Sequence, residues 1–461
     1  LTALATGTLA WAHADHRSRV LACEERGASV DALWDEGARA RLRERFAATG
    51  VHHAEQTASQ VIPWIDRWTS RWREVRTETC LAATVTGRLD APLSARADAC
   101  LDARRMDVET LLEEFGRADA AVVNKAVDAA AELMRVEPCG DPRYLARRSA
   151  LPIDSSARAR AVRRMLSRAT NLRVMGKYDE GVAAAEEALA LAESLDAATL
   201  AAEVRVCLGK LLHKSGAYEP AEEALTRAYV DGGLSGAHEA AADAAVELVF
   251  VTGYVLTRPD AGLVWARAAE LAVARVEPEE GPRAASRLSN LAVVQHVVGD
   301  PLEAKRLFER ALAIDRREMG PEHPRVAIRM NNLANVNDEL GLREEAEALH
   351  RQVLEIRERA LGPEHPSVSQ SLNNLAVLYA VHGEYAEASA LFDRALALAE
   401  RSLGADHPAL ADTLSGLATV YDATGRHADA RALLERAVAI SERSLGPDHP
   451  TVADTLNKSA T

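Results

Sequence analysis

Residues 320–324 read Gly-Pro-Glu-His-Pro, and the same five residues return unchanged at 362–366. Close variants follow at residues 404–408 and 446–450, so that a His-Pro pair recurs every 42 residues. After each of the first three loops come a helical pattern, a second glycine and another helical pattern built on Glu-Ala or Asp-Ala with a leucine three residues later. A strict period of this length, with two helices in each unit, predicts a solenoid of stacked helical hairpins.

The loop residues explain where each unit stops and starts. Glycine accepts the left-handed conformation that closes a helix, and a proline just beyond it cannot continue that helix. The second proline takes the first position of the next helix, where a missing N–H costs nothing. Alanines recur where the two helices of a hairpin must approach closely, at Ala334, Ala376 and Ala418 and at Ala346, Ala388 and Ala430.

These motifs resemble the tetratricopeptide repeat in the 42-residue form found in kinesin light chains and many bacterial proteins. The resemblance is regular over residues 282–461 and looser over residues 151–281, where Gly176 and Gly216 mark turns 40 residues apart. It implies an all-α fold, with an N-terminal helical domain followed by a right-handed superhelical solenoid of about seven helical hairpins. Residues 450–461 are expected to form a first helix without its partner, as in a chain truncated inside a longer protein.

Charge and motif content argue against several classes of function. A net charge of −14 and a pI near 5.6 disfavour nucleic-acid binding, which needs a basic surface. The sequence contains no glycine-rich phosphate loop, no His-Arg-Asp loop and no Asp-Phe-Gly motif, so no phosphoryl transfer is assigned to this chain. His52 and His53 lack partners at metal-ligand spacing, and we expect neither a metal nor a cofactor.

A different pattern precedes the repeats. Residues 1–12 are uncharged and contain Trp11, which fits the remnant of a transmembrane helix; a short core helix is the alternative, because a span takes about 20 residues. Residues 13–150 form a non-repeating helical domain. Its landmarks are Trp34-Asp35, F-A-A-T-G at 46–50, tryptophans at 64, 68 and 72, T-E-T-C at 77–80 and C-L-D-A-R-R-M at 100–106.

In order and spacing, these landmarks resemble the region after the transmembrane helix in bacterial Hanks-type serine/threonine protein kinases that carry C-terminal tetratricopeptide repeats. The resemblance implies an upstream kinase domain, one membrane span and an extracytoplasmic sensory or scaffolding region. Contact with the membrane would then be made only through that span, most of which is missing from this chain. The alternative is a freestanding cytosolic adaptor or regulatory protein.

Four of the five cysteines lie before the repeats and bear on the compartment. Cys80 and Cys100 are equally far from a turn expected around residues 90–92, so an antiparallel hairpin would bring them face to face. Of the three ways to pair four cysteines, this symmetry favours Cys80–Cys100 with Cys23–Cys139. Such disulfides imply an oxidising space outside the cytoplasmic membrane, whereas four reduced thiols fit a cytosolic domain.

The concave face of the regular repeats is the most informative surface, because the first helix of each hairpin lines it. By the tetratricopeptide resemblance, its ligand-facing positions are Asn290, Val293, His296, Asn331, Asn332, Asn335, Asp338, Asn373, Asn374, Val377, Thr419 and Asp422. Asparagine carries both donors and acceptors, so a ladder of asparagines can hold the backbone of an extended peptide. We therefore expect a protein or peptide partner, basic or neutral because the groove is acidic. The alternative is that the asparagines only bridge adjacent helices.

Overall fold

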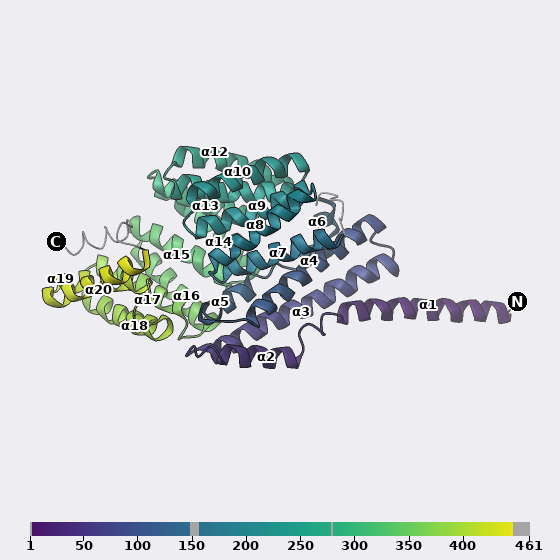
Figure 1. Cartoon of the computed structure of the whole chain (residues 1–461), viewed down its shortest axis with the longest axis horizontal. Helices are drawn as coiled ribbons and strands as arrows, with labels where there is room; N and C mark the ends of the chain where they lie inside the picture. Colours follow the sequence, from purple (N-terminus) through teal and green to yellow (C-terminus); the bar gives the residue numbers. More distant parts are fainter. Residues whose placement is uncertain (1, 148–155, 278–279, 446–461) are drawn as a thin grey trace. The chain divides into compact units, whose positions relative to one another are not determined.

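The computed structural model describes residues 2–147, 156–277 and 280–445, and every regular element in these ranges is a helix (Figure 1). The first six α-helices, with a 3-10 turn η1 (Glu137–Gly140) before the sixth, are α1 (Thr2–Ala28), α2 (Glu36–Ala47), α3 (Ala54–Thr84), α4 (Ala91–Phe115), α5 (Ala120–Ala131) and α6 (Pro142–Arg147). The unpartnered helix predicted for residues 450–461 lies outside the described residues.

Fourteen further helices follow along the described chain, two to each repeat. They are α7 (Ala157–Val174) with α8 (Tyr178–Ser194), α9 (Ala198–Lys214) with α10 (Tyr218–Ser235), α11 (His238–Phe250) with α12 (Pro259–Val276), α13 (Pro282–Val297) with α14 (Pro301–Met319), α15 (Pro324–Glu339) with α16 (Arg343–Leu361), α17 (Pro366–Val381) with α18 (Tyr385–Leu403), and α19 (Leu410–Ala423) with α20 (His427–Leu445). A π-helical segment η2 (Val251–Val255) follows α11. The predicted all-α class, with N-terminal helices before a tetratricopeptide solenoid of about seven hairpins, is confirmed.

The described residues fall into two compact units. The first unit contains residues up to 49 and residues 61–298, and so includes α1, α2, most of α3 and α4 to α13. The second unit contains residues 50–60 and the chain from 299 on, with α14 to α20. Within the second unit, the ring of buried His53 lies 6.0 Å from that of His365, in the loop before α17.

The His-Pro loops close one helix and open the next, as their residues predict. The first glycines of the three described loops adopt φ angles between 89° and 96°, a backbone conformation that residues other than glycine rarely adopt. His365 then caps α17, because its Nδ1 accepts the backbone N–H of Ser367 at 3.1 Å. His323 and His407 each accept the N–H two residues further on at 3.2 Å. Each of these histidines therefore accepts a backbone hydrogen bond within its own loop.

Large apolar side chains fill the space between hairpins of the second unit. Phe392 of α18 is fully buried and packs with Leu375 of α17 and Leu417 of α19. His350 of α16 stands at the same position one period earlier, and Phe308 stands one period before that. His350 is 3% exposed, and this burial lowers its pKa to about 4, so the ring is neutral at pH 7.

The N-terminal helices pack on the first repeat within the first unit. Thr110 of α4 hydrogen-bonds Ser167 of α7 at 2.7 Å, and both hydroxyls are buried. Glu114 of α4, which is 3% exposed, pairs with Arg168 of α7 at 2.8 Å. A buried carboxylate needs such a partner, so this ion pair fixes how α4 and α7 meet. The N-terminal helices thus share one compact unit with the degenerate repeats.

Four cysteines form two disulfides, but not the predicted pairs. Cys23 of α1 is bonded to Cys80 of α3, with a Cα–Cα distance of 5.5 Å. Cys100 of α4 is bonded to Cys139 of η1, with a Cα–Cα distance of 5.6 Å. The predicted pairs Cys80–Cys100 and Cys23–Cys139 are therefore wrong.

A stagger between α3 and α4 is the reason. Trp72 of α3 donates from Nε1 to the backbone carbonyl of Leu101 at 2.9 Å, which sets the register of this antiparallel pair. Counting from that contact toward the turn, Cys80 lies opposite Leu93. Cys100 is roughly seven residues further along α4, or about 10 Å along the helix axis. This separation is too large for a disulfide, whose Cα atoms lie about 4.4–6.8 Å apart.

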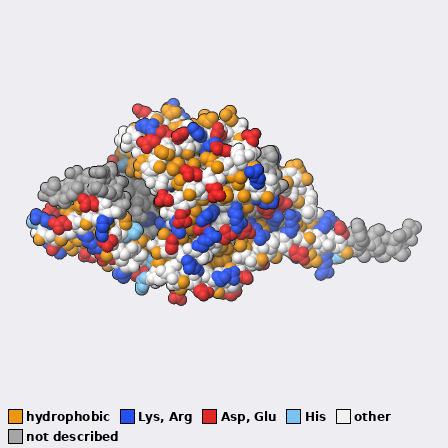
Figure 2. Space-filling model, viewed as in Figure 1, with side chains coloured by type: hydrophobic (Ala, Val, Ile, Leu, Met, Phe, Trp, Pro, Cys, Tyr) orange, Lys and Arg blue, Asp and Glu red, His pale blue; other side chains and the backbone are white. Residues whose placement is uncertain are grey.

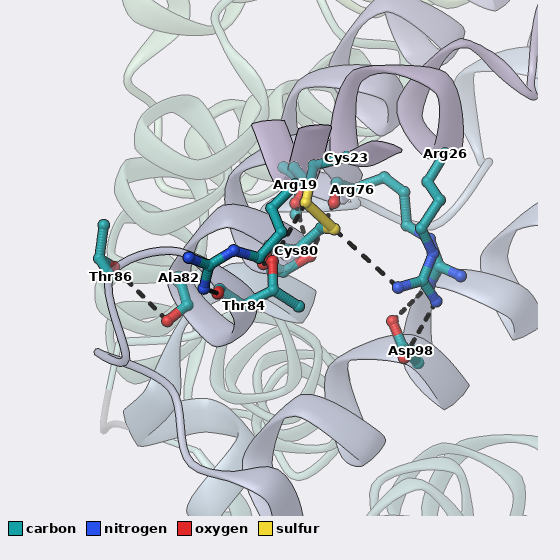
Figure 3. Close-up of a disulfide and its surroundings, with 11 residues drawn as sticks. Arg19, Cys23, Arg26, Arg76, Cys80, Ala82, Thr84, Thr86 and Asp98 are labelled. Carbon is teal, nitrogen blue, oxygen red and sulfur yellow. Dashed lines mark hydrogen bonds and ion pairs between the residues drawn. A yellow bond between two sulfur atoms is a disulfide. The ribbon is translucent and has the colours of Figure 1, made fainter. Parts of the chain in front are cut away.

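Polar contacts hold α1 beside its disulfide (Figure 3). Arg26 pairs with Asp98 of α4 at 3.5 Å, and Arg19 donates to the backbone carbonyl of Thr84 at 3.0 Å. The disulfide and these contacts attach the C-terminal half of α1 to α3 and α4.

Candidate functional site

Three first helices of the second unit carry most of the predicted ligand-facing residues. These are Asn331, Asn332, Asn335 and Asp338 on α15, Asn373, Asn374 and Val377 on α17, and Thr419 and Asp422 on α19. Within each helix they are mostly three or four residues apart, a spacing that places side chains on one face. Each helix therefore presents one stripe of predicted residues, and we refer to the three together as the groove stripes.

Two of the asparagines bond each other between helices. Asn374 of α17 donates from Nδ2 to Oδ1 of Asn331 on α15 at 2.6 Å, and both side chains are half-buried. Asn373 buries its Oδ1, which has no hydrogen-bond partner among the described residues. Asn332 is half-buried and Asn335 is exposed. Asn331 and Asn374 thus bridge adjacent helices, as in the alternative interpretation of the asparagines. Their contact with a peptide remains a prediction.

Apolar side chains are exposed on the same stripes. Ile328 of α15 is 49% exposed, and Val377 and Val381 of α17 are 44% and 69% exposed. Val381 follows Val377 by one helical turn, so the two side chains lie on the same face of α17 and form an apolar patch there. Val377 is among the predicted positions and Val381 is not, although its four-residue spacing was a readable signal.

The stripes include acidic side chains, and histidines contact two of them. Asp338 Oδ1 lies 2.8 Å from Nε2 of His382 at the end of α17, and Asp422 Oδ1 lies 2.7 Å from Nδ1 of His427. Asp412, in the first turn of α19, is exposed. The stripes therefore offer apolar, amide and acidic groups, a combination that suits a neutral or basic peptide.

The remaining predicted residues lie on α13, in the first unit. Asn290 donates from Nδ2 to the backbone carbonyl of Val246 on α11 at 2.7 Å. Val293 is half-buried and His296 is exposed. Asn290 thus joins two neighbouring first helices, as Asn374 does in the second unit.

Ion pairs connect three successive first helices of the first unit, α9, α11 and α13. Arg283 of α13 donates twice to the carboxylate of Asp243 on α11, at 2.8 and 3.3 Å, and Lys210 of α9 pairs with Glu247 of α11 at 3.2 Å. Burial opposes ionisation of Asp243, but Arg283 and Lys210 outweigh it and hold the pKa of this carboxyl below its usual range. Sequence reasoning missed this set because no fixed period relates its members.

Reactive and metal-binding groups are scarce in the described ranges. No group of three or more His, Cys, Asp or Glu side chains in these ranges can hold a metal ion. Cys207 is buried beside Thr170, and burial raises the pKa of its thiol, so it is a poor nucleophile. Over the described part of the chain, no helix combines the length and the apolarity that crossing a membrane requires.

Comparison with known proteins defines the class of the repeats. Residues 283–359, 339–388 and 378–443 match the family model of the tetratricopeptide repeat. Residues 283–443 are therefore tetratricopeptide repeats, and repeats of this kind serve protein–protein interaction through their extended surfaces. No curated protein matches the chain.

Solved structures with similar repeats come from several organisms. TPR-like repeats of Podosopora anserina, described as those of a kinesin light chain, are 27% identical with a TM-score of 0.38, over 44% of this chain and 95% of theirs. BtubC (BKLC) from P. vanneervenii is 23% identical with a TM-score of 0.35, over 59% of this chain and 94% of its own. A tetratricopeptide repeat protein from Parabacteroides merdae is 15% identical with a TM-score of 0.44, over 66% of this chain and 100% of its own.

Proposed function

We propose that this chain binds extended protein segments along the groove stripes of its regular repeats. The observation that carries the proposal is the exposure of Ile328, Val377 and Val381 next to exposed Asn335. Apolar side chains of a bound segment would pack on Ile328, Val377 and Val381 and be removed from water. The side-chain amide of Asn335 would hydrogen-bond the backbone of the segment. Exposed Asp412 adds a preference for basic or neutral segments.

Replacing Val377 and Val381 with serine is expected to weaken peptide binding at least about tenfold, because fully burying a valine side chain contributes roughly 1.5–3 kcal/mol. An array of synthetic peptides of about ten residues, rich in aliphatic and basic side chains, supplies the ligand. Fluorescence anisotropy then compares its affinity for the wild type and the double variant. Both valines are substantially exposed in the free protein, so the fold should persist.

Asn374→Ala is the matched contrast, because it removes the bond to Asn331. We expect it to lower the free energy of unfolding by about 1 kcal/mol and to change peptide affinity less than the valine variant does. Ala397→Ser, at an exposed position of α18, is the neutral control. Undiminished binding by the folded valine variant contradicts the proposal. A larger loss from Asn374→Ala instead identifies the asparagines as the principal contacts.

We further propose that this is the sensory or scaffolding region of a membrane-anchored bacterial serine/threonine protein kinase and that it lies outside the cytoplasm. Two features support the proposal: the landmarks of residues 13–150, and two disulfides in that region, which persist in oxidising compartments. The gene sequence upstream of the codon for Leu1 tests it, since a kinase domain followed by one apolar span is expected there. An upstream sequence with neither, and reduced thiols in the native protein, favours the freestanding cytosolic adaptor.

A further inference from the structure

Large apolar side chains are exposed on two second helices of the first unit. On α10, Val230 is 48% and Leu234 84% exposed; on α12, Val264 is 69% and Leu271 76% exposed. Isolated exposed leucines are common, but an apolar cluster of this kind is typical of an interaction surface. Figure 2 shows orange hydrophobic side chains among charged ones over this part of the molecule, near the top of the view.

A groove of about 340 Å³ is lined by three of these side chains, Val230 and Leu234 from α10 and Leu271 from α12. Tyr229, which also lines the groove, meets Trp265 of α12 edge to face, with ring centroids 5.2 Å apart. This ring contact joins the two helices beside the groove, so the site is formed before any partner arrives.

Repeat packing does not require this apolar surface. Helices α8, α10 and α18 all begin at a tyrosine two residues after a glycine. Where α10 carries Val230 and Leu234, α18 carries Ala397 and Arg401, and α8 carries alanine and serine. Since all three helices pack as second helices of hairpins, the valine and leucine of α10 are not explained by the solenoid.

Arg275 gives the groove a preference for negative charge. It lines the groove. Because it comes eleven residues after Val264 and four residues after Leu271, it lies on the same face of α12 as these two side chains. Neither Arg275 nor exposed Arg267 has an ion-pair partner among the described residues. The exposed carboxylate of Glu270 is turned from Leu271 by about 100° around the helix, so it does not neutralise the stripe.

We propose that this groove is a second docking site, which receives an acidic amphipathic helix of a partner protein. The apolar face of that helix covers Leu234 and Leu271, and a carboxylate at its edge meets Arg275. A second copy of this chain fits less well, because a symmetric contact sets arginines against arginines. An anionic membrane also fits less well, because membrane-surface helices rely on a strongly basic polar face and this stripe has only Arg267 and Arg275.

The test uses a synthetic helical peptide of about 18 residues with leucines on one face and glutamates on the other. Anisotropy with the full chain is expected to show binding that weakens as salt rises. A peptide with lysine in place of glutamate should bind at least about tenfold more weakly. Leu234→Ser with Leu271→Ser should weaken binding of the acidic peptide at least about tenfold. Arg275→Gln should weaken it about threefold and reduce its salt dependence.

Controls separate this site from the groove stripes and from a folding defect. Leu234 and Leu271 are largely exposed, so the serine variant should keep the circular dichroism spectrum of the wild type. Val377→Ser with Val381→Ser should bind the acidic peptide as the wild type does. No binding of the acidic peptide, or equal binding of the lysine peptide, overturns the proposal. It is overturned as well if the leucine variant loses only self-association in sedimentation, or only binding to phosphatidylglycerol vesicles.

Discussion

Replacing Cys23 and Cys80 with serine is expected to lower the free energy of unfolding of the first unit by about 4 kcal/mol, because their disulfide closes a loop of 57 residues. Without the bond, the unfolded chain regains the conformational freedom that the closed loop removes. Urea unfolding followed by tryptophan fluorescence measures the effect. All six tryptophans lie in the part of the chain assigned to the first unit, so the signal reports on that unit.

Cys207→Ala is the control, because it removes a buried cysteine that forms no disulfide. We expect a change of about 1 kcal/mol or less from the loss of one small buried group. Peptide mapping under non-reducing conditions should recover Cys23 linked to Cys80 and Cys100 linked to Cys139. Recovery of Cys80 linked to Cys100, or equal stability of the wild type and the double serine variant under oxidising conditions, would falsify this assignment.

Between pH 7.5 and pH 5, the free energy of unfolding of the second unit is expected to fall by about 2 kcal/mol less in His350→Phe than in the wild type. In the folded protein burial lowers the pKa of His350 to about 4, whereas an unfolded histidine titrates near its usual value of 6.5. Between these values the unfolded chain binds the proton and the folded chain does not. The contribution of His350 to stability is therefore complete above about pH 6.5 and is lost progressively as the pH falls toward 4.

Phenylalanine is the replacement that the neighbouring repeats suggest. Phe308 and Phe392 occupy the same repeat position and are 2% and 0% exposed. Urea unfolding followed by circular dichroism at both pH values measures the total helix, and tryptophan fluorescence in the same samples follows the first unit alone. His52→Gln, at an exposed histidine, should keep the wild-type pH dependence. An unchanged dependence in His350→Phe contradicts the assignment of a neutral buried ring.

The repeat architecture was predictable because its signals are local. A glycine with a positive φ, a proline at a helix start and a histidine that caps through its own side chain act within about five residues of one another. The loop at residues 320–324 therefore fixes where α14 ends and α15 begins without help from distant residues. Repeating that loop every 42 residues is enough to specify helical hairpins that stack.

The candidate site was predictable only in part. The tetratricopeptide resemblance identified the face that carries Asn331, Asn374 and Val377, and their spacing agrees with it, because side chains three or four residues apart share a helix face. It did not show that Asn374 bonds Asn331, since that bond depends on how far α17 is shifted along α15. Exposure has the same dependence: the spacing of Val381 from Val377 was readable in the sequence, but its 69% exposure was not.

Contacts between helices decided the rest. The choice of Cys23–Cys80 over Cys80–Cys100 follows from the stagger that Trp72 sets between α3 and α4, and no spacing in the sequence records that stagger. The groove lined by α10 and α12 likewise depends on helix packing, since Tyr229 and Trp265 join two helices that α11 separates along the chain. By itself, the sequence determined the repeat helices, their period and the faces they share, because caps, turns and spacing act over one or two helical turns. Only the tertiary structure decided which cysteines, asparagines and leucines meet, because helix offsets depend on side-chain packing summed over whole interfaces.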